Sequence, residues 1–169
     1  MTEQQTIDEV YRRRARQLAR QPVESSGATL PVLVFGLGRE RYGLELSELA
    51  EVFAYRGCTA VPAAPSAVLG VINVRGDIRA VVDLRRLLDL PSEENSTAGY
   101  VVMMRHHERP IGFRVDTIDG VRRIDLAQVN ADAARTSMSR SRFVKARVAG
   151  TLILIDTTAA LASLGLTRA

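Results

Sequence analysis

An internal repeat constrains the fold of this chain more than any other feature of its sequence. Residues 32–52 (VLVFGLGRERYGLELSELAEV) align without gaps on residues 101–121 (VVMMRHHERPIGFRVDTIDGV), a constant shift of 69 positions. A second block, residues 81–88, aligns on residues 154–161 at a shift of 73. Repetition of this kind predicts two like subdomains packed together, although apolar alternation by itself could produce part of the match.

Each copy of the repeat is a string of short apolar segments broken by Gly, Asp and Pro. Runs of four to eight residues rich in Val and Ile are typical of strands. We expect strands near 31–37, 40–45, 52–56, 69–75, 78–83, 99–105, 110–115, 120–124, 144–149 and 151–156. Asp83 and Asp156 each end a strand, and each can cap a short helix behind it. Strands this short close into small barrels that hide their edges.

The first 28 residues follow a different pattern. Residues 6–21 have the spacing of an amphipathic helix that Pro22 ends, and a linker rich in small polar residues follows. We therefore expect an N-terminal helix and linker at 1–28 and a domain at 29–169. Its halves, roughly 29–90 and 99–169, could interleave their strands.

Composition and charge exclude several classes of function. The chain has 169 residues, of which 46% are apolar and 25% charged, as in soluble globular proteins. It lacks the apolar core of a signal peptide and any run long enough to span a bilayer, so we expect a cytoplasmic protein without direct membrane insertion. The net charge is +4, but the bases are scattered among acids, and no nucleic-acid partner is expected.

The side chains that usually carry chemistry form no recognisable site. His106 and His107 are adjacent in an expected hairpin turn, where neighbouring rings point apart and do not share a metal. Cys58 lacks a histidine nearby in sequence and is interpreted as a bystander thiol. The segment 36–43 (GLGRERYG) leads into a strand instead of a helix, which excludes a phosphate-binding loop. We expect no enzyme activity, no catalytic residue, no metal and no cofactor.

The segment that joins the repeat blocks carries the most specific motif. It reads P-x-x-P, then G-hydrophobic-hydrophobic-N-hydrophobic-R-G, then D-L, at Pro62, Pro65, Gly70 to Gly76 and Asp83-Leu84. Upstream stand Phe35, Tyr42-Gly43-Leu44 and Glu51-Val52, and the second half supplies Ile111-Gly112, Val115-Asp116 and Val121. Over about residues 31–164 this pattern closely resembles the CheW-like family.

The resemblance implies a fold and a function. The fold is mainly β, with two intertwined five-stranded SH3-like β-barrels, short helices and here an extra N-terminal α-helix. The function is that of a non-catalytic adaptor in chemotaxis-like signal transduction. Its partners would be the cytoplasmic tip of a chemoreceptor (a methyl-accepting chemotaxis protein) and the regulatory domain of a CheA-type histidine kinase. Such a protein is cytoplasmic and is recruited to membrane receptor arrays.

The same resemblance implies site residues. The receptor-facing groove between the barrels would be lined by Glu51, Val52, Asn73, Arg75 and Gly76. Arg75 could bond receptor carbonyls or carboxylates while its stem packs on a helix, or it could merely tie the subdomains together. Ile118, Val121 and Leu126 are the candidates for the kinase contact, and they equally suit core positions.

Two departures from the family pattern concern different properties. The family often has a glycine in the strand where Lys145 and Ala146 stand, and this departure bears on the local shape of the second barrel. The arginine-rich helix at 6–21 lies outside the family motif and leaves an alternative function open. The chain could therefore be a CheW-like binding module of another signalling system, whose basic N-terminal helix contacts an acidic partner or nucleic acid.

Overall fold

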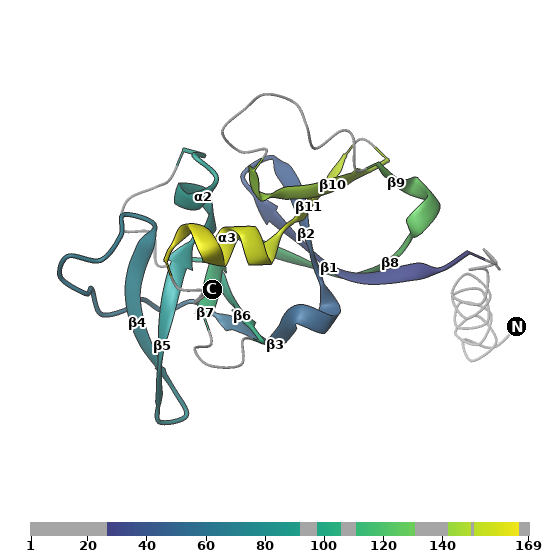
Figure 1. The fold of residues 1–169 in the computed structure, drawn as a ribbon. Coiled ribbons are helices and arrows are strands. Elements are labelled where there is room, and N and C mark those ends of the chain that lie inside the picture. The colour runs from purple at the N-terminus through teal and green to yellow at the C-terminus, as the bar shows by residue number, and fades with distance from the viewer. Residues whose placement is uncertain (1–26, 92–97, 106–110, 131–141, 150, 166–169) are drawn as a thin grey trace, which may run out of the picture.

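The computed structural model describes residues 27–91, 98–105, 111–130, 142–149 and 151–165, and within them strands dominate (Figure 1). The first half contains β1 (Thr29–Leu37), β2 (Glu40–Glu45), the 3-10 turn η1 (Leu46–Glu48), β3 (Leu49–Ala54), β4 (Val68–Val74), β5 (Asp77–Asp83) and α2 (Leu84–Leu87). The second half contains β6 (Tyr100–Met104), β7 (Ile111–Val115), β8 (Thr117–Asp125), η2 (Leu126–Gln128), β9 (Val129–Asn130), β10 (Val144–Val148), β11 (Leu152–Ile155) and α3 (Thr157–Ser163).

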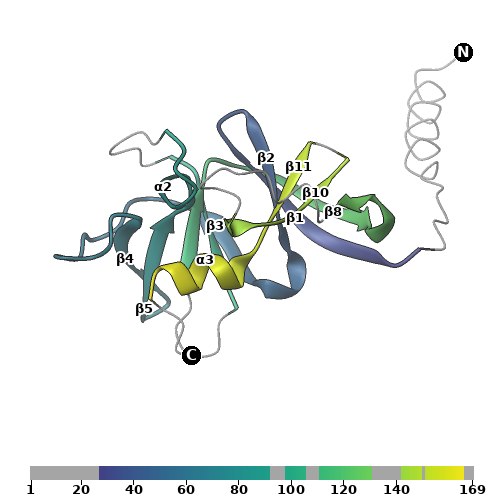
Figure 2. The same cartoon turned by 45° about the horizontal axis from the view of Figure 1, so that its top comes forward.

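The two halves exchange strands. A six-stranded sheet in the order β8-β1-β2-β11-β10-β9 combines the first two strands of the chain with the last four. A five-stranded sheet in the order β3-β6-β7-β5-β4 combines the remaining strands of both halves. We call these the first and the second barrel, and Figures 1 and 2 show them side by side, joined by strands that cross from one to the other.

The sequence repeat is preserved in the register of the strands. In the first barrel Gly43 on β2 faces Val34 on one side and Leu154 on the other. In the second barrel Gly112 on β7 faces Met103 and Val81. The shift of 69 positions relates Val34 to Met103 and Gly43 to Gly112, and the shift of 73 positions relates Val81 to Leu154. The barrels therefore share one pattern of strands and register, and each is assembled from both halves.

Close packing explains the two equivalent glycines. A Cβ atom built on Gly43 would lie 2.6 Å from Val32 Cγ1, and one built on Gly112 would lie 2.4 Å from Val101 Cγ1. Real Cβ atoms do not approach other carbons this closely, because packed interiors leave no such overlap. The neighbouring strands can therefore pack over β2 and β7 only because both positions lack a side chain.

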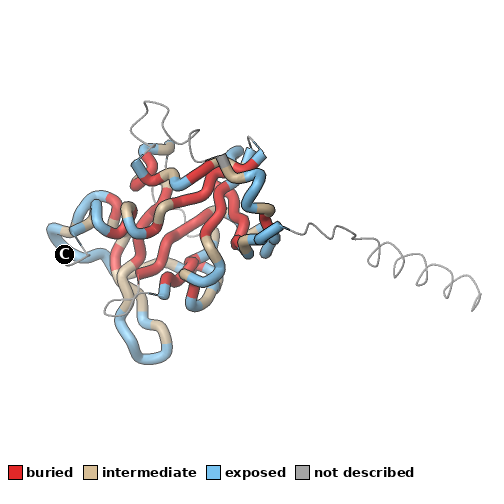
Figure 3. Tube along the Cα trace, turned by 45° about the vertical axis from the view of Figure 1, so that its right-hand side comes forward, coloured by how far each residue is buried: buried red, intermediate tan, exposed pale blue. Residues whose placement is uncertain are grey.

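Apolar side chains form one shared core and one smaller core inside each barrel. The central cluster, which includes Phe35, Leu44, Val102 and Phe113, draws on both barrels. The cluster of the first barrel is made of Val32, Ile124, Ala146, Val148 and Leu154, and that of the second of Tyr55, Val81, Val101 and Met103. Figure 3 shows these buried positions along the middle of the strands, with exposed residues at the hairpin tips.

The fold class expected from the sequence is confirmed, with differences in detail. Asp83 caps α2 by accepting from Arg85 N (2.9 Å), and Asp156 caps α3 by accepting from Ala159 N (2.9 Å). The first barrel has six strands instead of five, because the two-residue β9 pairs with β10 in a stretch expected to begin a loop. The strand expected at 52–56 begins at Leu49, directly after η1. The expected helix at 6–21 lies outside the described residues.

Candidate functional site

The hairpin between β4 and β5 presents the arginine singled out by the sequence. Val74 pairs with Asp77, so Arg75 and Gly76 form a two-residue turn, and both have positive φ (53° and 96°). Such a turn suits the twist of a hairpin, but it places an arginine in a left-handed conformation that favours Gly and Asn. Asn73 stabilises the turn by accepting a hydrogen bond at Oδ1 from Gly76 N (2.8 Å).

Arg75 crosses from this hairpin to the edge strand β3. Its Nη2 donates to Glu51 Oε2 over 3.2 Å, while the side chain stays 85% exposed. Val52 is also exposed and pairs across the ladder with Val102, which belongs to the central cluster. All five residues of the expected receptor site thus lie on the second barrel. The structure brings Glu51 to Arg75 and Asn73 to Gly76.

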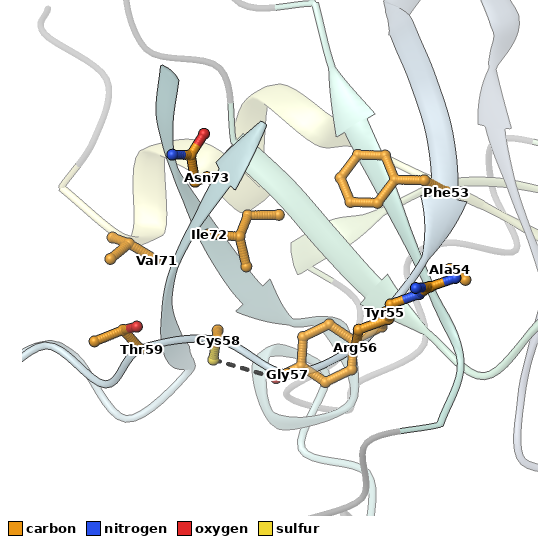
Figure 4. A pocket seen from close by; sticks show the side chains of 10 residues that line it. All are labelled: Phe53, Ala54, Tyr55, Arg56, Gly57, Cys58, Thr59, Val71, Ile72 and Asn73. Carbon is orange, nitrogen blue, oxygen red and sulfur yellow. Dashed lines mark hydrogen bonds between the residues drawn. The ribbon is translucent and has the colours of Figure 1, made fainter. Parts of the chain in front are cut away.

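A cavity of about 560 Å³ lies beside these residues, where β3 and β4 face each other without pairing (Figure 4). β3 and the segment after it contribute one wall and β4 the other, through Phe53, Ala54, Tyr55, Arg56, Gly57, Cys58, Thr59, Val71, Ile72 and Asn73. Thr59 and Val71 exchange two backbone hydrogen bonds at one end (2.9 and 2.8 Å), and the Arg75–Glu51 ion pair links β3 to the β4–β5 hairpin beyond Asn73. We call this opening between the outer strands of the second barrel the seam.

Two residues in the lining of the seam, Tyr55 and Cys58, interact with each other, and Tyr55 also contacts a buried charged pair. The Tyr55 hydroxyl donates to Cys58 Sγ (3.2 Å), and the Arg114 guanidinium lies 5.4 Å from the centre of the Tyr55 ring. Burial, followed by the hydrogen bond to Cys58, raises the pKa of Tyr55 to about 12, so the phenol stays protonated at neutral pH. Arg114 donates to Ala98 O (2.8 Å) and faces the buried Asp83 at 3.7 Å. The charge of Arg114 is therefore balanced inside the barrel.

The candidates for the kinase contact lie on the first barrel. Val121 on β8 is 55% exposed and Leu126 in η2 is 46% exposed, whereas Ile118 is half-buried against the central cluster. Val121 pairs with Leu33 on β1, just as Val52 pairs with Val102 on β6. Each barrel thus presents a valine at the same place on its edge strand. Val52 and Val121 occupy equivalent positions of the sequence repeat, and both are exposed. Equivalent apolar residues that both stay exposed can mark a pair of contact surfaces.

Other candidates from the sequence have simpler structural roles. The glycine-rich segment at 36–43 forms the hairpin between β1 and β2, with Gly38 at a φ of 60°. His106 and His107 lie outside the described residues. Within the described part of the chain, no group of three His, Cys, Asp or Glu side chains could hold a metal ion. Within the same residues, no helix has the length and apolar character that crossing a membrane requires.

Sequence reasoning did not anticipate the seam. Its walls are ordinary strand residues, and Tyr55 in its lining contacts Arg114, which is far away along the chain. The repeat contains one usable signal: Tyr55 corresponds to Ile124, an aliphatic member of the first barrel's core. A polar aromatic at one of two equivalent core positions indicates that the barrels differ inside.

Comparison with known proteins gives consistent matches. The model of the CheW-like domain family matches residues 31–164. "Chemotaxis protein CheW" of Helicobacter pylori is 26% identical over 124 residues, covering 73% of this chain and 75% of that protein. The protein of the same name from Thermotoga maritima is 30% identical over 99 residues, covering 59% and 65%. The crystal structure of scaffolding protein TtCheW from Thermoanaerobacter tengcongensis superimposes with a TM-score of 0.67 at 25% identity, covering 76% of this chain and 90% of that one.

Proposed function

Because the chain belongs to the CheW-like domain family, we propose that it is a non-catalytic adaptor that couples a chemoreceptor to a CheA-type histidine kinase. Relatives that carry the name chemotaxis protein, and a structural neighbour described as a scaffolding protein, support this assignment. Such an adaptor works by holding two partners in a defined geometry and needs no bond-making groups.

The observation that carries the proposal is the presentation of Arg75. An arginine at the tip of a hairpin, 85% exposed and in a backbone conformation better suited to Gly or Asn, is not explained by stability. Its guanidinium has five donors in a rigid fork, and the exposed pair with Glu51 can be exchanged for a partner's carboxylate or carbonyl at little cost. We assign the receptor contact to Arg75 with Glu51, Val52, Asn73 and Gly76.

The kinase contact is assigned to a separate surface of the first barrel. Val121 and Leu126 are exposed apolar side chains, and they are the kind of residue that is buried when one barrel packs against another. Ile118 would support them from within, since it packs on the central cluster. The β4–β5 hairpin and the β8–η2 end lie at opposite ends of the molecule (Figures 1 and 2). Both partners could therefore bind at once.

The experiment is a binding assay with two partners, namely a receptor-tip fragment and the isolated regulatory domain of the kinase. Arg75→Glu is expected to weaken the receptor interaction by about tenfold or more, because it replaces a donor by a like charge near Glu51. Val121→Glu is expected to weaken the kinase interaction instead. Arg39→Glu is the matched control, because Arg39 is an exposed arginine in the β1–β2 hairpin turn of the other barrel.

Three outcomes would contradict the assignment. Retention of neither partner by the native chain would refute the adaptor function. An equal loss with Arg75→Glu and Arg39→Glu would show that overall charge, not the site, governs the receptor interaction. Loss of both partners on changing Arg75 alone would show that the two surfaces are not separate.

A further inference from the structure

The seam of the second barrel is bordered by two strand edges with backbone groups directed into it. On β4, Val71 exchanges both of its backbone hydrogen bonds with Thr59, so its N–H and C=O point away from β5. Backbone groups of alternate residues in a strand point to the same side. Asn73, two residues further along, therefore directs its own N–H and C=O into the seam.

The same reasoning applies to the opposite wall. Tyr55 N donates to Gly99 O (2.9 Å), on the side of the second barrel where β3 pairs with β6. Ala54, the preceding residue, directs its N–H and C=O the other way, into the seam. The seam thus has a hydrogen-bond donor and acceptor on each wall, at Ala54 and at Asn73.

The first barrel has a pairing equivalent to that of Thr59 with Val71. There β9 pairs with β10, through Asn130 with Arg147 and Val129 with Val148. Leu30, Val129 and Leu152 also pack on the interior cluster of that barrel. The shifts of 69 and 73 positions assign Leu30 to Gly99 and Leu152 to Arg79 in the second barrel, and these two residues supply less apolar volume.

The dimensions and lining of the seam define what fits it. Along β4 it extends from Val71 to Arg75, about 13 Å of extended chain at roughly 3.3 Å per residue. Phe53, Tyr55 and Ile72 supply apolar surface toward the interior, and the exposed Arg56 lies on the rim. Two strand edges that face each other can bind an extended peptide backbone between them. The side chains of that peptide then point alternately toward the interior of the barrel and toward the rim.

We propose that the seam binds an extended peptide of about four residues, with apolar side chains directed inward and acidic side chains outward, which adds a strand between β3 and β4. The backbone of such a peptide would pair with Ala54 on one side and Asn73 on the other. An acidic side chain would be attracted to Arg56. This inference does not depend on the proposed adaptor function.

The test uses the isolated, isotope-labelled chain and the peptide acetyl-Val-Asp-Leu-Asp-amide, followed by NMR titration. We expect a dissociation constant on the order of 1 mM, with the largest shift changes at the amides of Ala54 and Asn73. The same peptide with methylated backbone nitrogens is the matched control, since it keeps the side chains but cannot donate backbone hydrogen bonds. It is expected not to bind.

A change in the protein provides an independent test. Ala54→Pro removes the N–H that points into the seam while leaving the bonds between β3 and β6 in place, so it should abolish binding. Ala54→Ser keeps that N–H and should bind normally. If Ala54→Pro does not fold, the methylated peptide still decides the question with the native chain. Equal binding of the two peptides would overturn the proposal. It would also be overturned if neither peptide bound at a peptide concentration of about 10 mM, tenfold above the expected dissociation constant.

Discussion

At the scale of single residues, Arg75 combines structural strain with exposure. A non-glycine residue with a φ of 53° costs roughly 1–2 kcal/mol compared with an unstrained conformation, and Asn tolerates this region better than Arg. The ion pair with Glu51 recovers less than this, because exposed pairs contribute about 0–1 kcal/mol. The two magnitudes indicate that Arg75 is unfavourable for the stability of the chain itself.

Arg75→Asn is therefore expected to stabilise the fold while weakening the receptor interaction. The expected gain is about 0.5–1 kcal/mol in the free energy of unfolding, measured by urea denaturation. Glu51→Gln serves as the control, because it removes the ion pair without changing the turn and should slightly reduce stability or leave it unchanged. A clear loss of stability with Arg75→Asn would mean that Arg75 serves the fold, which was the structural alternative considered for it.

A second residue-scale prediction concerns the close approach at Gly112. Gly112→Ala would place a methyl group 2.4 Å from Val101 Cγ1 and 2.8 Å from Met103 Sδ, so these side chains or the strands that carry them must move. We expect a loss of about 1–3 kcal/mol in the free energy of unfolding, as for other overpacked interiors. Val101→Ala should recover part of this loss in the double variant. Additive losses in a double-mutant cycle would show that the two side chains do not meet.

At the scale of elements, the sequence predicted the hairpins and caps better than the joints between strands. The pairs β1–β2 and β4–β5 follow from apolar runs separated by turn residues, and the capping aspartates follow from their place after a strand. η1, η2 and β9 were missed because three-residue turns and two-residue strands have too few residues for a periodic signal. The seam was missed for a related reason, since it depends on pairing that does not form.

Glu48 in the turn η1 leads us to predict that the stability of the fold depends on pH. Burial raises the pKa of Glu48 above its ordinary value of 4.5, and the nearby carboxylates of Glu45 and Asp156 raise it further, against a hydrogen bond with Thr157 and the charge of Lys145. The folded chain then holds the Glu48 proton more tightly than the unfolded chain. Its contribution to stability is present below pH 4.5 and is lost as the pH rises through the folded pKa.

Glu48→Gln should remove this loss. Relative to the native chain, the variant is expected to be more stable at pH 7 than at pH 4, as measured by urea unfolding at both values. Glutamine keeps an oxygen that can accept from Thr157, so the comparison isolates the charge. The difference in free energy of unfolding between the variant and the native chain cancels the contributions of the other titrating groups. No change in that difference with pH would show that the Glu48 carboxyl titrates alike in both states.

At the scale of the whole molecule, the repeat indicated two subdomains but not which strands build each one. Similarity between residues 32–52 and 101–121 establishes that the two stretches form like structures. This similarity does not determine whether β3 pairs with a strand of its own half or with β6, because the apolar face of β3 can pack in either arrangement. The structure has the exchanged arrangement, in which β1 and β2 lie with β8, β10 and β11. Only tertiary contacts decide between these possibilities.

This exchange makes a prediction about separated halves. A fragment of residues 1–91 contains the strands β1 and β2 without the rest of the first barrel, and β3, β4 and β5 without β6 and β7. Neither it nor a fragment of residues 98–169 can close a barrel or bury the central cluster. Each should therefore lack a cooperative unfolding transition by circular dichroism, whereas an equimolar mixture should regain one with a midpoint that rises with concentration. Cooperative folding of either fragment alone would mean that its strands can pair within one half, and the interlocked architecture would then not be what stabilises this chain.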